Sequence, residues 1–188
     1  MQTENRIPSE RMLETERTFL SLLTEEDLPA MMEMAREPDT FKYIKKLHIM
    51  TESEYTRFLQ VKLEQIHDKT GFHWAVWLKG PPPASLAGAT GKPSRTFIGA
   101  VNLNPIAGTP MMQIGCQLKR DYWRQGFASE LTRRILDFGM NEARLKAVYG
   151  VFEKENDASR RLLEKLGFVW QETRDEQGIT LEIHKYPA

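Results

Sequence analysis

Hydrophobic and polar residues follow two different spacings along the chain, and the changes of spacing mark the expected elements. Short runs rich in β-branched and aromatic residues predict strands at 18–23, 72–78, 96–106, 111–119 and 146–152. Two further runs, 168–174 and 178–186, predict a closing hairpin. Apolar residues at helical spacing predict four helices: one after Thr24, one from Thr51, one through residues 131–138 and one at 156–168.

Several of these predicted helices carry recognisable end signals. Thr24 with Asp27 is a weaker form of a capping box, and Thr51 with Glu54 is a full one. In the last helix, Ala158, Leu162 and Leu166 are predicted to share the inward face, with Leu163 beside them. Gly167 follows that helix, where a left-handed glycine is expected to end it.

The order of elements predicts a mixed α/β (α+β) fold. Consecutive strands favour antiparallel pairing, and the strand–helix–strand order at 111–152 implies one parallel crossover. We therefore expect a mostly antiparallel sheet of six to seven strands, flanked by about four helices. The length of 188 residues fits one domain, at 16–188, after a polar N-terminal arm at 1–15.

Composition narrows the classes of function. Lys plus Arg and Asp plus Glu both number 26, so no global positive charge favours a nucleic-acid partner. The chain has one cysteine, Cys116, and no run of 18 apolar residues, which predicts a cytoplasmic protein without a membrane span. The four histidines lack metal-ligand spacing, so no metal is predicted. Monomer and homodimer are both open.

The stretch "DYWRQGFASELTRRILDFGM", residues 121–140, places Gly126 at the start of a helix. A helix start exposes unpaired N–H groups at the positive end of the helix dipole, and small residues let an anion approach them. The alternative is that Gly126 only relaxes a turn while Trp123 and Phe127 pack in the core. Neither a Walker nor a three-glycine Rossmann pattern is present, so the segment predicts a pocket for a phosphate or diphosphate of another kind.

A second segment, "VFEKENDASRRLLEKLGF" at 151–168, begins a helix at the end of a strand. Asn156 is expected as a plain helix cap, although it could also bind an amide-rich ligand arm, with Ser159 facing the same cleft. In the strand at 111–119, Ile114, Cys116 and Leu118 alternate on one predicted buried face. Gly115 between them suggests a bulge or a close approach of another group.

With "IGCQLKRDYWRQGFASE" and "ENDASRRLLEKLGF" in this order, the chain resembles the GNAT superfamily, and within it the RimJ/RimL-like ribosomal-protein acetyltransferases. The resemblance implies an N-acetyltransferase that moves an acetyl group from acetyl-CoA to a primary amine by direct attack in a ternary complex. It also implies a set of acetyl-CoA-binding residues: Cys116, Gln117 and Leu118 along the pantetheine, Arg124, Gln125, Gly126, Phe127, Ala128 and Ser129 around the diphosphate, and Asn156.

The chain departs from the family at one catalytic position. Many members carry a Tyr where this chain has Leu163, so Ser159 or a water is expected to protonate the leaving thiolate. The general base is unassigned, because Glu153, Glu155 and His73 are each expected to be solvated. Two alternatives remain: a non-catalytic acetyl-CoA-binding module and an unrelated phosphate-binding domain. The acceptor could be a protein N-terminus, a polyamine, an amino acid or an antibiotic amine.

Overall fold

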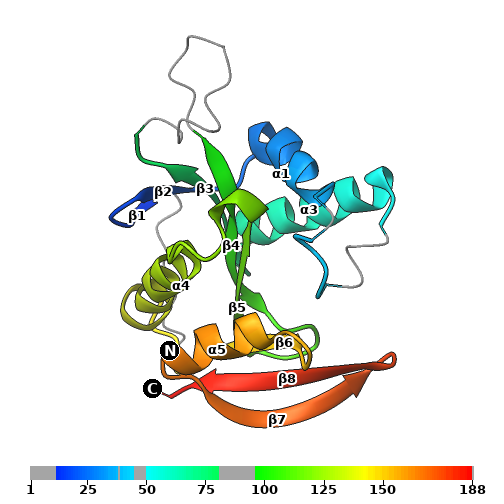
Figure 1. The fold of residues 1–188 in the computed structure, drawn as a ribbon, viewed down its shortest axis with the longest axis vertical. Coiled ribbons are helices and arrows are strands. Elements are labelled where there is room, and N and C mark those ends of the chain that lie inside the picture. Colours follow the sequence, from blue (N-terminus) through cyan, green and yellow to red (C-terminus); the bar gives the residue numbers. More distant parts are fainter. Residues whose placement is uncertain (1–11, 38, 45–49, 81–95, 188) are drawn as a thin grey trace.

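The computed structural model describes residues 12–37, 39–44, 50–80 and 96–187 (Figure 1). One eight-stranded sheet runs through the molecule in the order β1-β2-β3-β4-β5-β6-β8-β7. Its strands are β1 (Leu13–Glu14), β2 (Thr18–Leu22), β3 (Phe72–Leu78), β4 (Phe97–Pro105), β5 (Met112–Leu118), β6 (Val148–Glu153), β7 (Val169–Glu176) and β8 (Ile179–Tyr186). All neighbours are antiparallel except β5 and β6, which confirms the predicted fold class and its single parallel pair.

Four α-helices cover the sheet within the described residues: α1 (Leu28–Ala35), α3 (Glu52–His67), α4 (Phe127–Asp137) and α5 (Asp157–Lys165). Two 3-10 turns, Glu25–Asp27 and Arg120–Tyr122, precede α1 and α4, and a π-helical turn at Phe138–Glu142 extends α4. The two expected capping boxes, at Thr24 and at Thr51, are both formed. Local sequence signals therefore determine where these helices begin.

The two faces of the sheet carry separate apolar cores. Trp74 and Val76 belong to the core that also contains α4 and α5 residues, and Ala75 between them belongs to the core beneath α1 and α3. Side chains of successive strand residues point to opposite faces, so α1 and α3 cover one face and α4 and α5 the other. Figure 1 shows α1 and α3 on one side of β3 and β4 and α4 on the other.

Several local expectations differ from the structure. Leu13 lies in the segment predicted as a polar arm, but it is buried in the sheet as part of β1, which brings the strand count to eight. In α5, Leu163 is the buried residue, whereas Ala158 is exposed. Leu163 packs inward because Gly150 on β6 leaves space for it: a Cβ at Gly150 would lie 2.3 Å from Leu163 Cδ1.

Two loops singled out in the sequence lie partly outside the described residues. The segments concerned are 45–49, after α1, and 81–95, between β3 and β4. Irregular pairing occurs between Val76 and Trp77 and between Trp170 and Glu172, whereas Gly115 is paired regularly with Asn102. The expected close approach of another group at Gly115 is confirmed, since a Cβ there would lie 2.5 Å from the side-chain oxygen of Asn102.

Candidate functional site

The parallel strands β5 and β6 are paired over only two positions, Gln113 with Tyr149 and Ile114 with Gly150. β5 continues to Leu118 and β6 to Glu153 without further pairing between them. The second half of β5 therefore has one open edge in the middle of the sheet. An open strand edge can hydrogen-bond an extended ligand in the way that a neighbouring strand would.

The alternation of the ladder determines which residues face this open edge. Lys119 N–H donates to the Ile98 carbonyl on β4 at 2.9 Å, so Gln117, two residues earlier, also points its backbone groups toward β4. Cys116 and Leu118 point theirs the other way, toward the gap. Because β5 is paired with β6 only as far as Ile114, the backbone N–H and C=O of Cys116 face the gap beyond the paired positions.

Trp123 closes the end of this edge. Its indole N–H donates to the Leu118 carbonyl at 2.7 Å, and its side chain is 39% exposed. The alternative in which Trp123 packs in the core is therefore wrong. The buried rings at this turn are those of Tyr122 and Phe127, whose centroids lie 5.9 Å apart in an edge-to-face arrangement.

The turn from Arg124 to Ser129 presents a run of backbone amides. Trp123 N–H is bonded to the Arg120 carbonyl and Glu130 N–H to the Gly126 carbonyl. Within the described part of the chain, the N–H groups of residues 124–129 between them have no acceptor, and no side chain caps α4. Arg124, Gln125 and Gly126 are exposed, so solvent reaches these amides.

The backbone of this turn has two left-handed residues, Arg124 with φ +59° and Gly126 with φ +85°. Such conformations direct successive N–H groups into one concavity, which together with the dipole of the eleven-residue α4 makes an anion-binding site. Arg124 has a Cβ and holds this conformation at a cost of about 1 kcal/mol or more. Strain of this kind persists where surrounding contacts impose it.

Arg17, the residue before β2, supplies those contacts. Its guanidinium donates to the Gln125 carbonyl at 3.0 Å, pairs with Glu130 at 2.7 Å and lies 3.9 Å above the Phe127 ring. Burial would by itself raise the pKa of Glu130, but hydrogen bonds from Thr15 and Arg17 hold that pKa below its usual value. Sequence reasoning missed Arg17, because a contact across 113 residues leaves no local signal.

The second motif lies at the start of α5. The Asn156 side-chain oxygen accepts from Ser159 N–H at 3.1 Å, so the expected helix cap is present. Asn156 and Ser159 are both half-buried. Leu163, at the position where many GNAT members carry Tyr, is buried over Gly150, the last β6 residue that pairs with β5.

Two of the three candidate general bases are buried, although all three were expected to be solvated. His73 is 3% exposed and Glu153 is 4% exposed, so neither is solvated, whereas Glu155 is exposed. Burial, with a smaller contribution from nearby Lys62, lowers the pKa of His73 to about 2. The imidazole is therefore neutral at any physiological pH. The burial of His73 and Glu153 comes from the elements that pack over these strands, which the sequence around each residue does not reveal.

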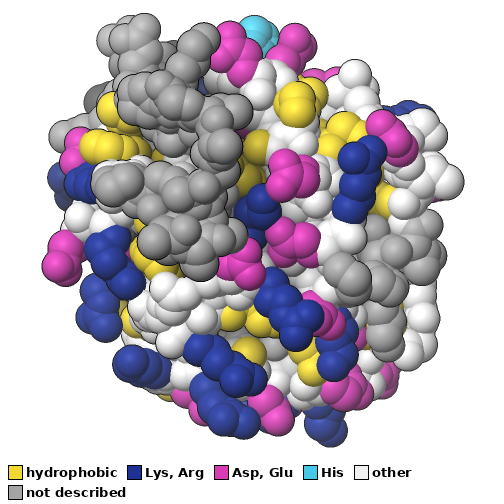
Figure 2. Space-filling model, turned by 45° about the horizontal axis from the view of Figure 1, so that its top comes forward, with side chains coloured by type: hydrophobic (Ala, Val, Ile, Leu, Met, Phe, Trp, Pro, Cys, Tyr) yellow, Lys and Arg dark blue, Asp and Glu magenta, His cyan; other side chains and the backbone are white. Residues whose placement is uncertain are grey.

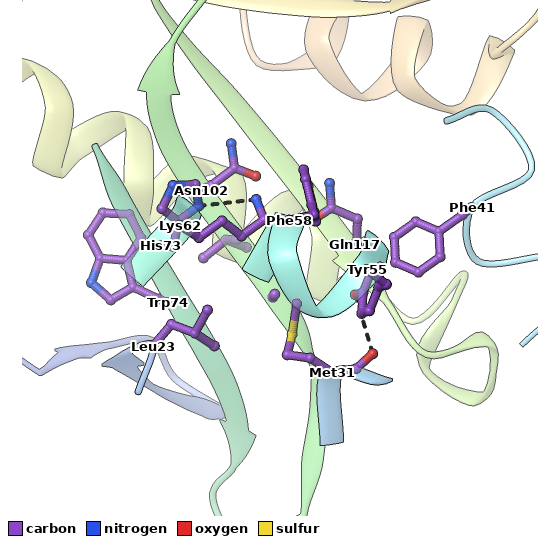
Figure 3. Close-up of a pocket in the computed structure, with 12 residues that line it drawn as sticks. Leu23, Met31, Phe41, Tyr55, Phe58, Lys62, His73, Trp74, Asn102 and Gln117 are labelled. Atoms are coloured by element: carbon purple, nitrogen blue, oxygen red, sulfur yellow. Dashed lines mark hydrogen bonds between the residues drawn. The ribbon is translucent and has the colours of Figure 1, made fainter. Parts of the chain in front are cut away.

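His73 lines a cavity of about 30 Å³ between α3 and the sheet, large enough for one or two waters (Figure 3). Lys62 and Tyr55 reach it from α3, and Asn102 and Gln117 reach it from β4 and β5. Gln117 follows Cys116, whose side chain packs against the opposite core. The cavity and the anion-binding turn thus lie on opposite faces of the sheet, with the open edge of β5 between them.

Cys116 is not suited to act as a nucleophile. Burial raises the pKa of its thiol to about 12. The reactive form of cysteine is the thiolate, which is scarcely populated at neutral pH with such a pKa. This favours direct transfer over a covalent enzyme intermediate.

The described residues do not carry the features of a metal site or of a membrane span. No group of three or more His, Cys, Asp or Glu side chains there could hold a metal ion. None of the helices in the same residues is long and apolar enough to cross a bilayer. On the face drawn in Figure 2, acidic side chains are interspersed among the basic ones outside the grey residues. A single-sign patch of the kind that binds a phosphate backbone is not seen on that face.

Comparison with known proteins identifies the class. Residues 17–169 match the family model described as the acetyltransferase (GNAT) domain. The chain is 24% identical over 158 residues, 84% of its length and 82% of the relative's, to the uncharacterized N-acetyltransferase YoaA of Bacillus subtilis. This chain belongs to the GNAT acetyltransferase family.

Two solved structures share the fold. The spermidine N-acetyltransferase of Vibrio cholerae, in complex with CoA and spermine, is 18% identical, with a TM-score of 0.69 and coverage of 89% of this chain and 94% of that one. The ribosomal-protein acetyltransferase RimL in complex with coenzyme A is 11% identical, with a TM-score of 0.70 and coverage of 93% and 97%. These neighbours have different acceptors, so the fold does not specify one.

Proposed function

We propose that this chain is an acetyl-CoA-dependent N-acetyltransferase that acts on a primary amine by direct attack within a ternary complex. The observation that supports it best is the run of open amides at residues 124–129 beside the unpaired edge of β5. A helix N-terminus of this kind binds a diphosphate, and the strand edge binds an amide-rich arm such as pantetheine.

Each residue of the proposed site has a distinct role. The amides of Arg124, Gln125, Gly126, Phe127, Ala128 and Ser129 hold the diphosphate. Cys116 and Leu118 offer backbone groups to the pantetheine, whereas Gln117, whose backbone faces β4, contributes its side chain to the cavity. The Asn156 side-chain oxygen is already used by the cap, so its amide NH₂ is the group left to bind the pantetheine.

The transfer needs little covalent chemistry from the protein. The amine nitrogen attacks the thioester carbonyl carbon, the carbon–sulfur bond breaks, and the amine proton leaves as the thiolate departs. Holding both reactants in line supplies much of the acceleration. The Cys116 N–H, which faces the gap between β5 and β6, is the proposed donor to the oxyanion, and Ser159 is the proposed donor of a proton to the thiolate.

The tests are ligand-dependent stability and turnover. Acetyl-CoA should raise the melting temperature where ATP does not, and thiol release should appear with some member of an amine panel. Stabilisation without turnover on any amine would favour the non-catalytic alternative, for which the buried Leu163 in place of Tyr is the supporting observation. Stabilisation by ATP and not by acetyl-CoA would contradict the proposed family function.

Ser159→Ala tests the proton donor. We expect kcat to fall by roughly 10- to 100-fold, at the low end of general acid catalysis because a thiolate leaves more readily than an alkoxide. The KM for acetyl-CoA should stay within about twofold, because only the Ser159 backbone is bonded to Asn156. Ser53→Ala on α3 is the matched control. An unchanged kcat would exclude Ser159 from proton transfer.

Arg17→Met tests the contacts that impose the turn. The variant keeps an unbranched side chain but removes the guanidinium that lies over Phe127 and bonds to Gln125 and Glu130, so the amides lose their common direction. We expect about tenfold weaker acetyl-CoA binding by calorimetry, or about 1.4 kcal/mol. Arg36→Met, which removes a fully solvated ion pair with Glu52, should leave affinity unchanged. Equal affinities of the two variants would contradict this role of Arg17.

A further inference from the structure

The cavity between α3 and the sheet contains an amine with no anionic partner. Lys62 as a whole is half-buried, but its Nζ lies 3.4 Å from Nδ1 of the buried His73 and 4.4 Å above the Phe58 ring (Figure 3). Within the described residues, no Asp or Glu pairs with Lys62 or lines the cavity. A cation removed from water normally has a carboxylate partner, and this one has only neutral groups.

The hydrogen bonds around His73 show how this amine is oriented. His73 Nε2 lies 2.7 Å from the Gln65 side-chain oxygen, which can only accept, so the ring proton is on Nε2. Nδ1 is then an acceptor, and Lys62 donates to it. The ammonium has three N–H groups. One is used by Nδ1, and the contact with Phe58 is electrostatic, so donors remain for a further partner.

The remaining polar groups at the cavity cannot neutralise this charge. The amides of Asn102 and Gln117 are neutral, and burial raises the pKa of Tyr55 to about 12, so its phenol stays protonated. His73 is neutral because burial lowers its pKa to about 2. Burial also lowers the pKa of Lys62 to about 8, which leaves it mostly charged at pH 7. Lys62 is therefore the one charged group among the described lining residues.

We propose that Lys62 binds a carboxylate of the acceptor, and that the acceptor is accordingly an amine carrying an anionic group, such as an amino acid, and not a polyamine. This inference rests on the proposed acetyl transfer, because the cavity is treated as the acceptor side of the site. Gln117 on β5 borders the cavity, and its neighbour Cys116 faces the open edge, so an acceptor held here lies beside the thioester. A polyamine would meet repulsion from Lys62 and no carboxylate among the described lining residues.

The size of the cavity limits the choice of probes. The cavity of about 30 Å³ has room for a carboxylate but not for a larger group, so the probes must be small. We would use acetate, which has the carboxylate but no amine, and acetamide as its neutral match. Binding is measured calorimetrically with the full chain saturated with CoA. The wild type should bind the carboxylate at least about tenfold more tightly than the amide.

Lys62→Met removes the charge and keeps a flexible stem of similar length. It should abolish the preference for the carboxylate, whereas Lys62→Arg should keep most of it. Its affinity for acetyl-CoA should be unchanged. An unaltered preference in Lys62→Met, or no carboxylate binding in the wild type, would overturn the proposal.

The charge of Lys62 also predicts a pH dependence. Because its pKa is near 8, the ammonium loses its proton as pH rises from 7 to 9, and carboxylate binding should weaken over this window. The probe carboxylate stays ionised throughout, and His73 and Tyr55 do not titrate there. Affinity that is constant from pH 7 to 9 would contradict the role of Lys62.

Turnover separates this inference from the proposed function itself. With acetyl-CoA, we would compare kcat/KM for glycine, glycinamide and spermidine in the wild type and in Lys62→Met. The variant should raise KM for glycine about tenfold with little change in kcat, as expected for lost ground-state binding. A wild type that favours spermidine would overturn the acceptor class but not acetyl transfer. Acetyl-CoA binding without any turnover would refute transfer, and the carboxylate-binding measurement would still decide the role of Lys62.

Discussion

Gly126→Glu should abolish acetyl-CoA binding, with a loss of roughly 100-fold or more in affinity. The new side chain would stand among the open amides of residues 124–129 and compete for them with its own carboxylate, while repelling the diphosphate. Isothermal calorimetry with acetyl-CoA measures the loss. Activity on any amine should disappear with it.

The fold should survive this change. A Cβ at Gly126 would meet only the Arg17 guanidinium, at an ordinary 3.5 Å, so the main penalty is the left-handed backbone, about 1 kcal/mol. Gly126→Asn pays a smaller backbone penalty, because Asn tolerates this conformation, and it carries no charge. The Asn variant should retain binding within about tenfold. Normal affinity of Gly126→Glu would refute the diphosphate site.

Gly99→Ala should be the most destabilising single-methyl change in the described sheet, by about 3 kcal/mol. A Cβ there would lie 2.2 Å from the Gln117 carbonyl oxygen and 2.9 Å from Leu118 Cα, and both are backbone atoms that cannot rotate away. β4 and β5 would have to separate at Gln117 and Leu118, beside the open edge. Thermal unfolding should show a melting temperature lower by roughly 6–12 °C.

Gly108→Ala is the matched control for this variant. Gly108 also has a positive φ, +72°, but nothing lies within 4 Å of its Cβ position. It should lose only the backbone contribution, about 1 kcal/mol. If both alanine variants unfolded at the same temperature, close contact between β4 and β5 would not be the cause.

Local sequence patterns predicted most of the helices and strands because the interactions that form them join residues only a few positions apart. The capping boxes at Thr24 and Thr51 formed where the residues stand, since their hydrogen bonds span only three residues. Gly167 ends α5 with a φ of +91°, and Phe168 N–H bonds back to the Leu163 carbonyl at 3.0 Å, as expected for such a terminus. The alternation of Ile114, Cys116 and Leu118 likewise identified the face that packs against the α4-side core.

Predictions failed where burial depends on a partner distant in the chain. The inward residue of α5 is Leu163 because Gly150 on β6 leaves a space for it, and helical spacing alone cannot indicate that space. His73 and Glu153 are buried by neighbouring elements, although each resembles a solvated polar residue in sequence.

The sequence alone determined the class of protein and the segments that carry the proposed cofactor site, because the turn at Gly126 and the cap at Asn156 are short-range features with characteristic residues. Only the tertiary structure decided which backbone groups are open, that Arg17 holds the turn, and that Lys62 lies against neutral partners in a cavity. These properties depend on contacts between segments that are far apart in the sequence, and the spacing of hydrophobic and polar residues gives no sign of such contacts.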